Sequence, residues 1–566
     1  MAEHLRVPRT DFLTWTMQGR EWVDFEWLSQ LILYSLYRLG GFKLLVLFKG
    51  ALLAAVTVIS WRTAEIGGRF RAWGKPLLRC PPVAQSPGRG AAWLYMPFFA
   101  AGIIVASDLR PENFSLLFFA ALLYRLERDR AAGGTDFSLR TGVLAAVFFA
   151  LWTNLHAGYL YGLVLVMIYF LGGFCRASLP FVYGRNPGFQ SGRYTAYLKY
   201  AAIGLAASLL NPYGWKIYGV ILNHQKYIAL MQEYIQEWNT FDLTNVFQAP
   251  YVITLAGVFG LFLWRFIRTK EIVYEHFGAL LFFAWASANH SRHIPFFIMT
   301  ALPYSAGMLG VPAADDINKY SRRALQGAAL AALIWHYSVS IWPLYTGGAT
   351  LFNVQSEGLA DFLQANKARL APLRLFNYWG WGGFLGYKLG PDYKVFIDGR
   401  YLFHEKLEEA VSLGSNLDRW KVFIDKYKFD LMLIKLDGSK IPLKQRLPSG
   451  REVVFQRPAY LFYLPRKDWA MIYWDYRVAA LVRRKAVDPA WLADHEYRYF
   501  RPADSANIVL PVLEGEIKYS ELETEIRRYL KSNTVFYEGS SVTDEVLNYQ
   551  SAIKQLCKDK NAKCRQ

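Results

Sequence analysis

The chain has 566 residues, of which 53% are hydrophobic and 17% aromatic, and its formal net charge at pH 7 is +19. This profile is typical of a polytopic α-helical membrane protein, and anchoring to anionic lipid explains much of the positive charge without a nucleic-acid partner. The sequence has no Walker loop, GxSxG, HExxH or dinucleotide glycine fingerprint, so soluble nucleotide chemistry is unsupported.

Residues 1–42 predict an extracytoplasmic loop followed by a helix in the membrane interface, which Gly40-Gly41 then breaks. Asp24 and Glu26 flank one residue, so they share a face only if this segment is extended. There they would serve as a general base or as ligands of a divalent metal ion, and Asp11 is a third acid of this kind. The alternative is a helix N-terminus, with Asp24 as the N-cap and Glu26 favoured by the helix dipole.

Residues 43–346 predict a transmembrane domain of about ten spans. The apolar stretches are 43–61, 91–107, 113–125, 141–154, 157–174, 198–211, 248–266, 276–289, 293–310 and 324–346. Several are shorter than the ~20 residues of a straight span, so tilted or re-entrant elements are expected among them. Lys and Arg gather in the loops that follow the odd-numbered stretches, which the positive-inside rule places in the cytoplasm.

Two polar motifs lie in loops that this orientation places on the outer face. In Trp152-Thr-Asn-Leu-His-Ala-Gly158, Asn154 and His156 are candidates for binding a sugar or phosphate, although a structural histidine is nearly as good an interpretation. Further on, Glu237-Trp238 repeats the pairing of Glu26 with Trp27, and an aromatic ring beside an acid suits a sugar platform.

The run His290-Ser-Arg-His293 lies on the same face, between two apolar stretches. Ionisable residues at such a position predict function in a membrane protein. Arg292 offers a bidentate fork for a lipid-linked phosphate, and His290 and His293 offer donors or a proton. The alternative is a solvated hairpin turn that happens to be basic.

After residue 346 no apolar run is long enough to span, so residues 347–566 predict an extracytoplasmic α/β domain with a helical C-terminal tail. Expected strands are 394–397 and 431–435, a hairpin is expected at 451–464, and helices are expected at 359–366, 405–412, 417–427, 468–495 and 519–531. Cys557 and Cys564 suggest a small disulfide loop in the tail.

This predicted domain also contains a motif rich in glycine and aromatic residues. Trp379 and Trp381 offer flat surfaces for a substrate, and the glycines beside them let backbone approach a ligand. Asp398 and Arg400 end a predicted strand, which is a common place for substrate-binding groups. The alternative for this pair is a tight turn with an internal Asp–Arg contact.

Several of these motifs, in this order, resemble a family of bacterial inner-membrane proteins of the GT-C glycosyltransferase type. They are Pro8-Arg-Thr-Asp11, Trp22-Val-Asp-Phe-Glu-Trp-Leu28, Trp152-Thr-Asn-Leu-His-Ala-Gly158, Asn211-Pro-Tyr-Gly214, Arg292-His-Ile-Pro-Phe296 and Tyr393-Lys-Val-Phe-Ile-Asp-Gly-Arg400. The order of aromatic motif, strand, Asp and helix also resembles, more loosely, the catalytic subunits of oligosaccharyltransferases.

The resemblance implies transfer of a sugar from a polyprenyl-phosphate-linked donor to a glycan, lipid or protein on the outer face of the inner membrane. It also implies a base or metal ligand in the loop after the first span. Relatives carry a first helix and an Asp–Trp-rich stretch before the equivalent of His4-Leu-Arg6, so both are expected to be missing here. A non-catalytic scaffold of the same fold is the main alternative, and a transporter of lipid-linked sugars ranks last.

Overall fold

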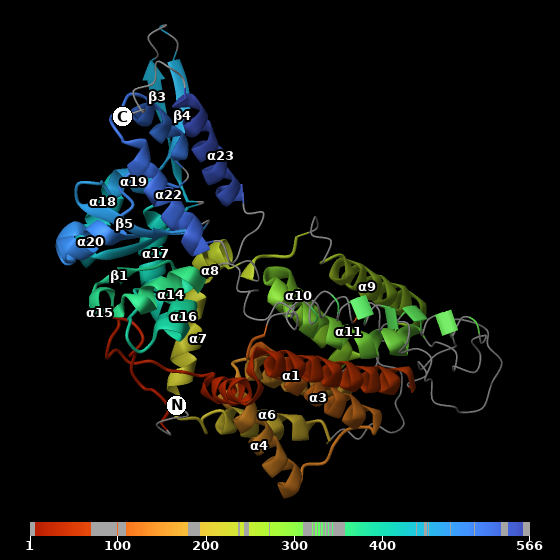
Figure 1. Cartoon of the computed structure of the whole chain (residues 1–566). Helices are drawn as coiled ribbons and strands as arrows, with labels where there is room; N and C mark the ends of the chain where they lie inside the picture. The colour runs from red at the N-terminus through yellow and green to blue at the C-terminus, as the bar shows by residue number, and fades with distance from the viewer. Residues whose placement is uncertain are drawn as a thin grey trace. The chain divides into compact units, whose positions relative to one another are not determined.

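The structure is a computed structural model, and it falls into two compact units. It describes residues 6–69, 99, 109–178, 193–235, 238–242, 248–270, 272–309, scattered residues between 320 and 342, 357–436, 438–446, 450, 452–475, 477–502, 504–533 and 541–558. The helical unit comprises Met1–Pro8 and Val23–Leu351, and the α/β unit comprises Arg9–Trp22 and Phe352–Gln566. Figure 1 labels the elements of both units.

The helical unit is built from helices, most of which are apolar. They are α1 (Trp27–Arg69), α3 (Glu112–Ala131), α4 (Leu139–Leu155), α5 (Tyr159–Ser178), α6 (Thr195–Ala207), α7 (Lys216–Lys226), α8 (Ile228–Tyr234), α9 (Ala249–Thr269), α10 (Tyr274–Asn289), η4 (Ser291–His293) and α11 (Ile294–Leu309). Among the described residues, Trp27–Ile66, Tyr159–Ser178 and Ala249–Arg268 are long and apolar enough to cross a membrane, and Leu139–Leu155 is a shorter apolar helix. The expected stretches 91–107 and 324–346 lie almost wholly outside the described residues, so the number of spans stays a prediction.

Helix α1 consists of two helical stretches that meet at Gly40–Gly41, where neither residue has helical dihedral angles. Gly41 has a φ of 62°, a conformation that glycine adopts without steric penalty. The predicted break at this position is therefore confirmed. It separates the expected interfacial helix from the first expected span.

Helices α3, α5, α10 and α11 pack around an aromatic core. Phe119 of α3 makes edge-to-face contacts with Phe283 of α10 at 5.1 Å and with Phe296 of α11 at 4.9 Å, measured between ring centroids. Polar groups lie at both ends of α3. Glu112 begins the helix, and the buried Glu127 lies fifteen residues later, roughly 22 Å along the axis. Glu127 contacts Arg130 and His276, each at 2.8 Å, so this end of the helix is held by buried ionisable groups.

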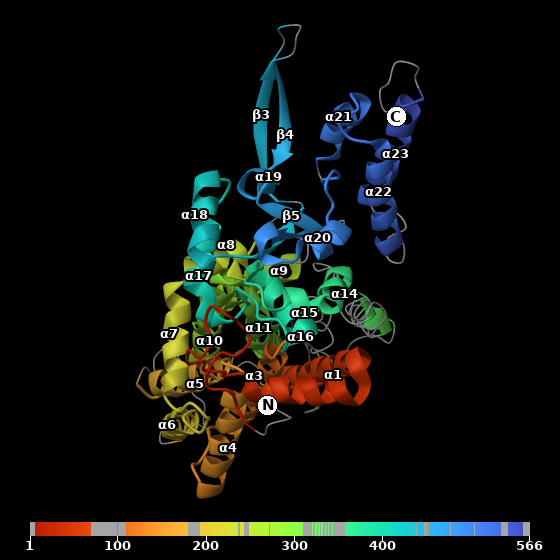
Figure 2. The ribbon, with the colours of Figure 1, turned by 60° about the vertical axis from the view of Figure 1, so that its left-hand side comes forward.

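The α/β unit contains a four-stranded sheet in the order β1-β2-β6-β5, and a separate hairpin of β3 and β4 that Figure 2 shows as two long paired strands. The strands are β1 (Leu375–Phe376), β2 (Leu431–Lys435), β3 (Lys440–Arg446), β4 (Glu452–Pro458), β5 (Trp469–Trp474) and β6 (Val478–Arg483). Strand β1 runs parallel to β2, whereas β6 is antiparallel to both β2 and β5.

Helices make up much of the rest of the α/β unit. They are α14 (Glu357–Ala365), α15 (Lys367–Leu370), η6 (Trp379–Trp381), α16 (Gly382–Leu389), η7 (Tyr401–Phe403), α17 (His404–Ser412), α18 (Leu417–Tyr427), α19 (Tyr460–Tyr463), η8 (Arg484–Ala486), α20 (Pro489–His495), η9 (Ser505–Ile508), α21 (Val509–Leu513), α22 (Tyr519–Asn533) and α23 (Ser541–Leu556). Cys557 is disulfide-bonded, and its expected partner Cys564 lies outside the described residues.

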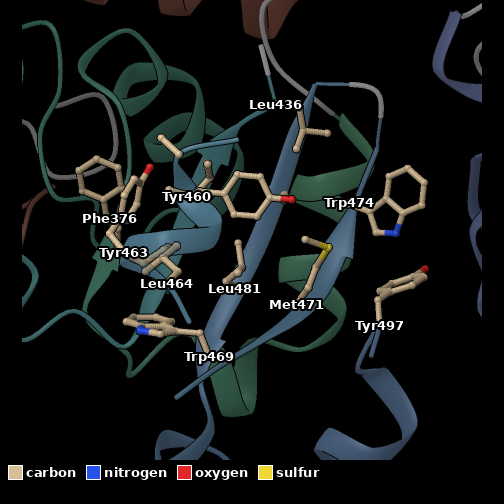
Figure 3. Packing of buried hydrophobic residues seen from close by; sticks show 14 of the residues in the cluster. Phe376, Leu436, Tyr460, Tyr463, Leu464, Trp469, Met471, Trp474, Leu481 and Tyr497 are labelled. Carbon is tan, nitrogen blue, oxygen red and sulfur yellow. The ribbon is translucent and has the colours of Figure 1, made fainter. Parts of the chain in front are cut away.

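The sheet is buried on both faces. In β2, Met432 and Ile434 belong to one hydrophobic cluster, and Leu431 and Leu433 belong to another. Figure 3 shows part of the first cluster, with Trp469, Met471 and Leu481 from neighbouring strands. A strand buried on both faces reads as a continuous apolar run without alternation.

The expected helix at 468–495 is wrong, because this range contains the buried antiparallel strands β5 and β6, and among its described residues only Pro489–His495 is an α-helix. Periodicity cannot distinguish such short apolar runs from a buried helix. The expected hairpin at 451–464 is also misplaced. Strand β4 pairs with the preceding strand β3, and Tyr460–Tyr463 is helical.

The expected strand at 394–397 is not part of the sheet, because Val395 pairs with the N-terminal segment Arg9–Trp22. The Trp15 amide donates to the Val395 carbonyl, and the Val395 amide donates to the Leu13 carbonyl, each at 3.2 Å. The Trp15 indole also donates to the Leu375 carbonyl at 3.0 Å. This segment, which we expected in an outer loop with residues 23–42, thus forms part of the α/β unit.

The glycines at the start of α16 lie in different surroundings. A Cβ atom on Gly382 would lie 2.1 Å from the Ile397 carbonyl oxygen, whereas a Cβ on Gly383 would meet nothing within 4 Å. Gly382→Ala is therefore expected to destabilise the α/β unit by about 2 kcal/mol, the scale of overpacking, and Gly383→Ala to leave its stability almost unchanged. Proteolysis of the purified protein along a urea series measures both, and equal effects would contradict the geometry.

Candidate functional site

Four polar side chains converge at one end of the helical unit. They are Glu26 before α1, Glu112 at the start of α3, His156 in the α4–α5 turn and Arg292 on η4. Arg292 Nη2 lies 3.0 Å from Glu112 Oε2, and His156 Nε2 lies 3.6 Å from Glu26 Oε1. We call this set the acid–arginine cluster. It brings together residues that are far apart in the sequence and leaves their side chains partly exposed.

Arg292 is held on three sides. Helix α10 ends at Asn289, and the Ser291 amide then donates to the Asn239 carbonyl at 3.0 Å, which fixes the turn. The guanidinium carbon of Arg292 lies 5.2 Å from the centre of the Trp238 ring, within cation–π range. The Arg292 side chain keeps 19% of its surface exposed, so a guanidinium fixed by Glu112 and Trp238 remains accessible to an anion.

Each of the two neighbouring histidines has its Nδ1 atom bonded to a backbone carbonyl. His290 Nδ1 lies 2.9 Å from the Trp238 carbonyl oxygen, and His293 Nδ1 lies 3.2 Å from that of Ala286. Because a carbonyl only accepts, both Nδ1 atoms carry the proton. His293 Nε2 then accepts from the Tyr161 hydroxyl at 2.6 Å. Both nitrogens of His293 are thus engaged, so of the three predicted phosphate ligands Arg292 is the best placed.

Asp24 and Glu26 have different surroundings. The Asp24 carboxylate accepts from the Glu26 amide at 3.4 Å and from the Gln30 side chain at 2.8 Å, which favours the capping interpretation for Asp24. Burial, with the negative charge of Asp24, raises the pKa of Glu26 to about 7, although Arg292 opposes the shift. A carboxyl that exchanges its proton near neutral pH suits general acid–base chemistry.

We expect Glu26 to react with dicyclohexylcarbodiimide, which modifies protonated carboxyl groups, with a midpoint near pH 7. Below this pH the carboxyl is mostly protonated and reactive, and about one pH unit above it the labelling rate should be roughly tenfold lower. Peptide mass spectrometry of the purified protein measures labelling at Glu26, and Glu26→Gln is the blank. A midpoint near the ordinary glutamate value of about 4.3 would contradict the expected shift.

Asn154, His156 and Trp238, three of the four predicted substrate residues of the helical unit, lie in or beside the cluster. The Asn154 amide donates to the carbonyls of Ala150 and Leu210 at 2.7 and 2.8 Å, and its oxygen accepts from the Trp27 indole at 2.7 Å. The Trp238 ring lies beside the Arg292 guanidinium. Glu237 lies outside the described residues. Binding of substrate by Asn154, His156, Glu237 or Trp238 stays a prediction.

The other predicted site residues belong to the α/β unit. Arg400 Nε donates to Asp398 Oδ1 at 2.8 Å, and Arg400 Nη2 donates to Asp11 Oδ1 at 2.6 Å. This is the internal Asp–Arg contact that the sequence left open as an alternative, extended by Asp11. Trp381 is buried in the second hydrophobic cluster, and Trp379 is partly buried. Whether any of these residues contacts a substrate stays a prediction.

Glu112 is the residue of the cluster that the sequence analysis missed. It follows Arg110-Pro111 immediately before the apolar stretch 113–125, and an acid in that position was an available signal. No local pattern, however, shows that Glu112 pairs with Arg292, which lies 180 positions later in the chain.

The sequence also suggested a divalent metal ion at this site. Among the residues that the structure describes, no three His, Cys, Asp or Glu side chains form a group that could hold a metal ion. The Glu112 carboxylate is already paired with Arg292. The metal therefore stays a prediction, and no step of the proposed mechanism depends on it.

No protein-family model and no curated sequence matches the chain. Among solved structures it shares the fold of GT-C glycosyltransferases. The Archaeoglobus fulgidus oligosaccharyltransferase tethered to an acceptor peptide matches with a TM-score of 0.51 and 12% identity, over 99% of this chain and 80% of that one. Oligosaccharyltransferase AglB from the same organism, in complex with an inhibitory peptide and a dolichol-phosphate, matches with a TM-score of 0.50 and 11% identity, over 98% and 80%.

A third structure, ArnT from Cupriavidus metallidurans bound to undecaprenyl phosphate, matches with a TM-score of 0.42 and 14% identity, over 85% of this chain and 91% of that one. That score is too low to define a common fold by itself. The likeness to the oligosaccharyltransferases is at the level of fold, so a function has to be inferred from the residues of the acid–arginine cluster.

Proposed function

We propose that the protein is a membrane glycosyltransferase that moves a sugar from a polyprenyl-phosphate-linked donor to an acceptor on the outer face of the inner membrane. The observation that carries this proposal is the acid–arginine cluster, in which the partly exposed Arg292 guanidinium lies in the same site as Glu26. The GT-C fold supports it, and so does the AglB structure of this fold, which is in complex with a dolichol-phosphate.

In this mechanism Arg292 acts on the donor phosphate and Glu26 acts on the acceptor hydroxyl. The Arg292 fork binds the donor phosphate through charge-assisted hydrogen bonds. Glu26, in its ionised form, takes the proton from the acceptor hydroxyl as the acceptor oxygen bonds to the anomeric carbon. The bond from that carbon to the phosphate oxygen breaks, and Arg292 stabilises the negative charge of the departing polyprenyl phosphate. The proton remains on Glu26 until it passes to solvent.

Glu112 has a supporting role in this proposal. Before the donor binds, its carboxylate neutralises Arg292 at 3.0 Å and orients the guanidinium. The donor phosphate then shares Arg292 with Glu112 or displaces it. We place the α/β unit on the outer face, where it would help to select a glycan, lipid or protein acceptor.

The test uses a matched pair of lipids on the purified full chain in nanodiscs. Undecaprenyl phosphate should raise the thermal transition temperature, because a ligand that binds the native state stabilises it. Undecaprenol, which has the same chain without the phosphate, should not. Release of undecaprenyl phosphate from a panel of undecaprenyl-phosphate sugars, with a membrane extract as the source of acceptors, then tests turnover whatever the identity of the acceptor.

Equal responses to the two lipids would contradict a phosphate site. Binding of undecaprenyl phosphate without turnover on any donor, in the presence of the same membrane extract, would instead favour the non-catalytic scaffold.

A further inference from the structure

The α4–α5 turn holds one histidine in a dense set of hydrogen bonds. His156 follows the last residue of α4, and its Nδ1 atom lies 2.8 Å from Ser115 Oγ and 3.0 Å from the backbone nitrogen of Gly158. Ser115 Oγ also accepts from the indole N–H of Trp152 at 2.8 Å. Ser115 and Trp152 are completely buried, so water does not compete for these bonds.

These contacts fix the position of the histidine proton. The Gly158 backbone N–H can only donate, so His156 Nδ1 must be an acceptor and carries no proton. The Ser115 hydroxyl, which already accepts from Trp152, then donates its own hydrogen to the same Nδ1. The neutral ring therefore has its proton on Nε2. Burial lowers the pKa of His156 to about 4, in agreement with a neutral ring at physiological pH.

The protonated nitrogen faces Glu26. His156 Nε2 lies 3.6 Å from Glu26 Oε1, slightly beyond a hydrogen bond, and ionisation of the carboxyl would attract the N–H. Trp27, the residue next to Glu26, is held by the same motif, because the Asn154 side chain accepts from the Trp27 indole at 2.7 Å. The motif at 152–158 thus holds both members of the Glu26–Trp27 pair.

Gly158 is required for this arrangement. A Cβ atom on residue 158 would lie 2.3 Å from Ser115 Oγ and 3.1 Å from His156 Nδ1, and the hydrogen bonds could not form. The sequence motif therefore has one physical explanation that covers Trp152, Asn154, His156 and Gly158 together.

We propose that His156, oriented by Ser115 and Gly158, is a positioning residue that presents a single N–H donor to Glu26 and stabilises its ionised form. The inference rests on the proposed function only in assigning Glu26 as the base. A hydrogen bond to the charged form of an acid favours that form, and so opposes the burial that disfavours it. The other charged groups that act on Glu26 are Asp24 on its own segment, Arg110 and Glu112 at the start of α3, and Arg292 on η4.

The test measures the pH midpoint of Glu26 labelling by dicyclohexylcarbodiimide in the full chain, without donor or acceptor. His156→Leu removes the donor at similar volume and should raise the midpoint by about one pH unit. His156→Gln keeps an N–H at the end of the side chain and should restore the midpoint to near that of the wild type. Ser115→Ala leaves the ring in place but removes one of the bonds that orient it, so its shift should be smaller and in the same direction.

His495→Ala is a matched control and should leave the midpoint unchanged. His495 lies on α20 in the α/β unit, where its Nδ1 bonds the Trp491 carbonyl. The positioning role is overturned if His156→Leu labels with the wild-type midpoint, or if His156→Gln shifts as far as His156→Leu. Should His156→Leu fail to fold, an unchanged midpoint in Ser115→Ala overturns it as well.

The result is independent of the proposed function. If His156→Leu leaves the pH midpoint of Glu26 labelling unchanged while the wild type binds undecaprenyl phosphate, only the positioning role is contradicted. If His156→Leu raises the midpoint but the wild type does not bind undecaprenyl phosphate, only the proposed function is contradicted.

Discussion

Replacing Arg292 with Ala is expected to lower the affinity for undecaprenyl phosphate by roughly a hundredfold and to reduce turnover below detection. The expected loss corresponds to about 3 kcal/mol, the scale of charge-assisted hydrogen bonds between a guanidinium and a phosphate. The affinity is measured on protein in nanodiscs, from the thermal transition temperature as a function of lipid concentration.

Removal of Arg292 alone leaves the Glu112 carboxylate in a largely buried position without its cation. The double variant Arg292→Ala/Glu112→Gln removes both charges and separates a folding defect from a binding defect. Arg268→Ala, at an exposed position in the last turn of α9, should bind undecaprenyl phosphate as the wild type does. Unchanged affinity in the double variant would show that the phosphate binds elsewhere.

Arg400→Ala is expected to destabilise the α/β unit by about 3 kcal/mol or more. The Arg400 guanidinium bonds both Asp398 and Asp11, whose carboxylates are buried, and it also lies 4.4 Å from the centre of the Trp22 ring. Truncation therefore leaves two buried negative charges without their cation and removes a contact that holds the segment Arg9–Trp22. The fraction of α/β unit cleaved in a pulse of protease along a urea series measures the change in stability.

A conservative and a distant variant sharpen this second prediction. Arg400→Lys keeps the charge but not the planar fork, so it should fall between the wild type and Arg400→Ala. Arg527, paired with Glu523 at 3.2 Å but 73% exposed, should cost no more than about 0.5 kcal/mol when replaced by Ala. If Arg400→Ala proves as mild as Arg527→Ala, the buried ion pairs do not hold the α/β unit together.

Local patterns predicted much of the helical architecture. The apolar stretches 113–125, 141–154 and 276–289 lie within α3, α4 and α10, and the expected helix at 417–427 coincides with α18. In each case the signal is contained in neighbouring residues. The His290–His293 run was found for a related reason, since a basic group between two apolar stretches is visible without knowing its partners.

The partners themselves could not be predicted, because they depend on contacts between distant segments. Nothing near Asn154 shows that it bonds Trp27, and nothing near Val395 shows that its strand partner is Thr14 rather than a strand of the main sheet. The same limit applies to Asp398 and Arg400. A turn that binds a substrate and a turn that binds its own chain cannot be distinguished by their local sequence. Here they are distinguished by the position of Asp11 beside Arg400 in the structure.

The discontinuity of the α/β unit has a consequence for how the protein is made. Residues 9–22 leave the ribosome before every helix of the helical unit, yet their partners Leu375, Phe396 and Arg400 are synthesised 360 to 389 positions after the residues they bind. The segment therefore stays without these partners while the intervening helices are synthesised. A fragment that starts at Phe352 would lack this segment and would leave Phe396, Tyr427 and Phe429, which surround Trp15, without their covering ring. Completion of the α/β unit is thus a late event in biogenesis, because it needs segments that lie before and after the helical unit in the chain.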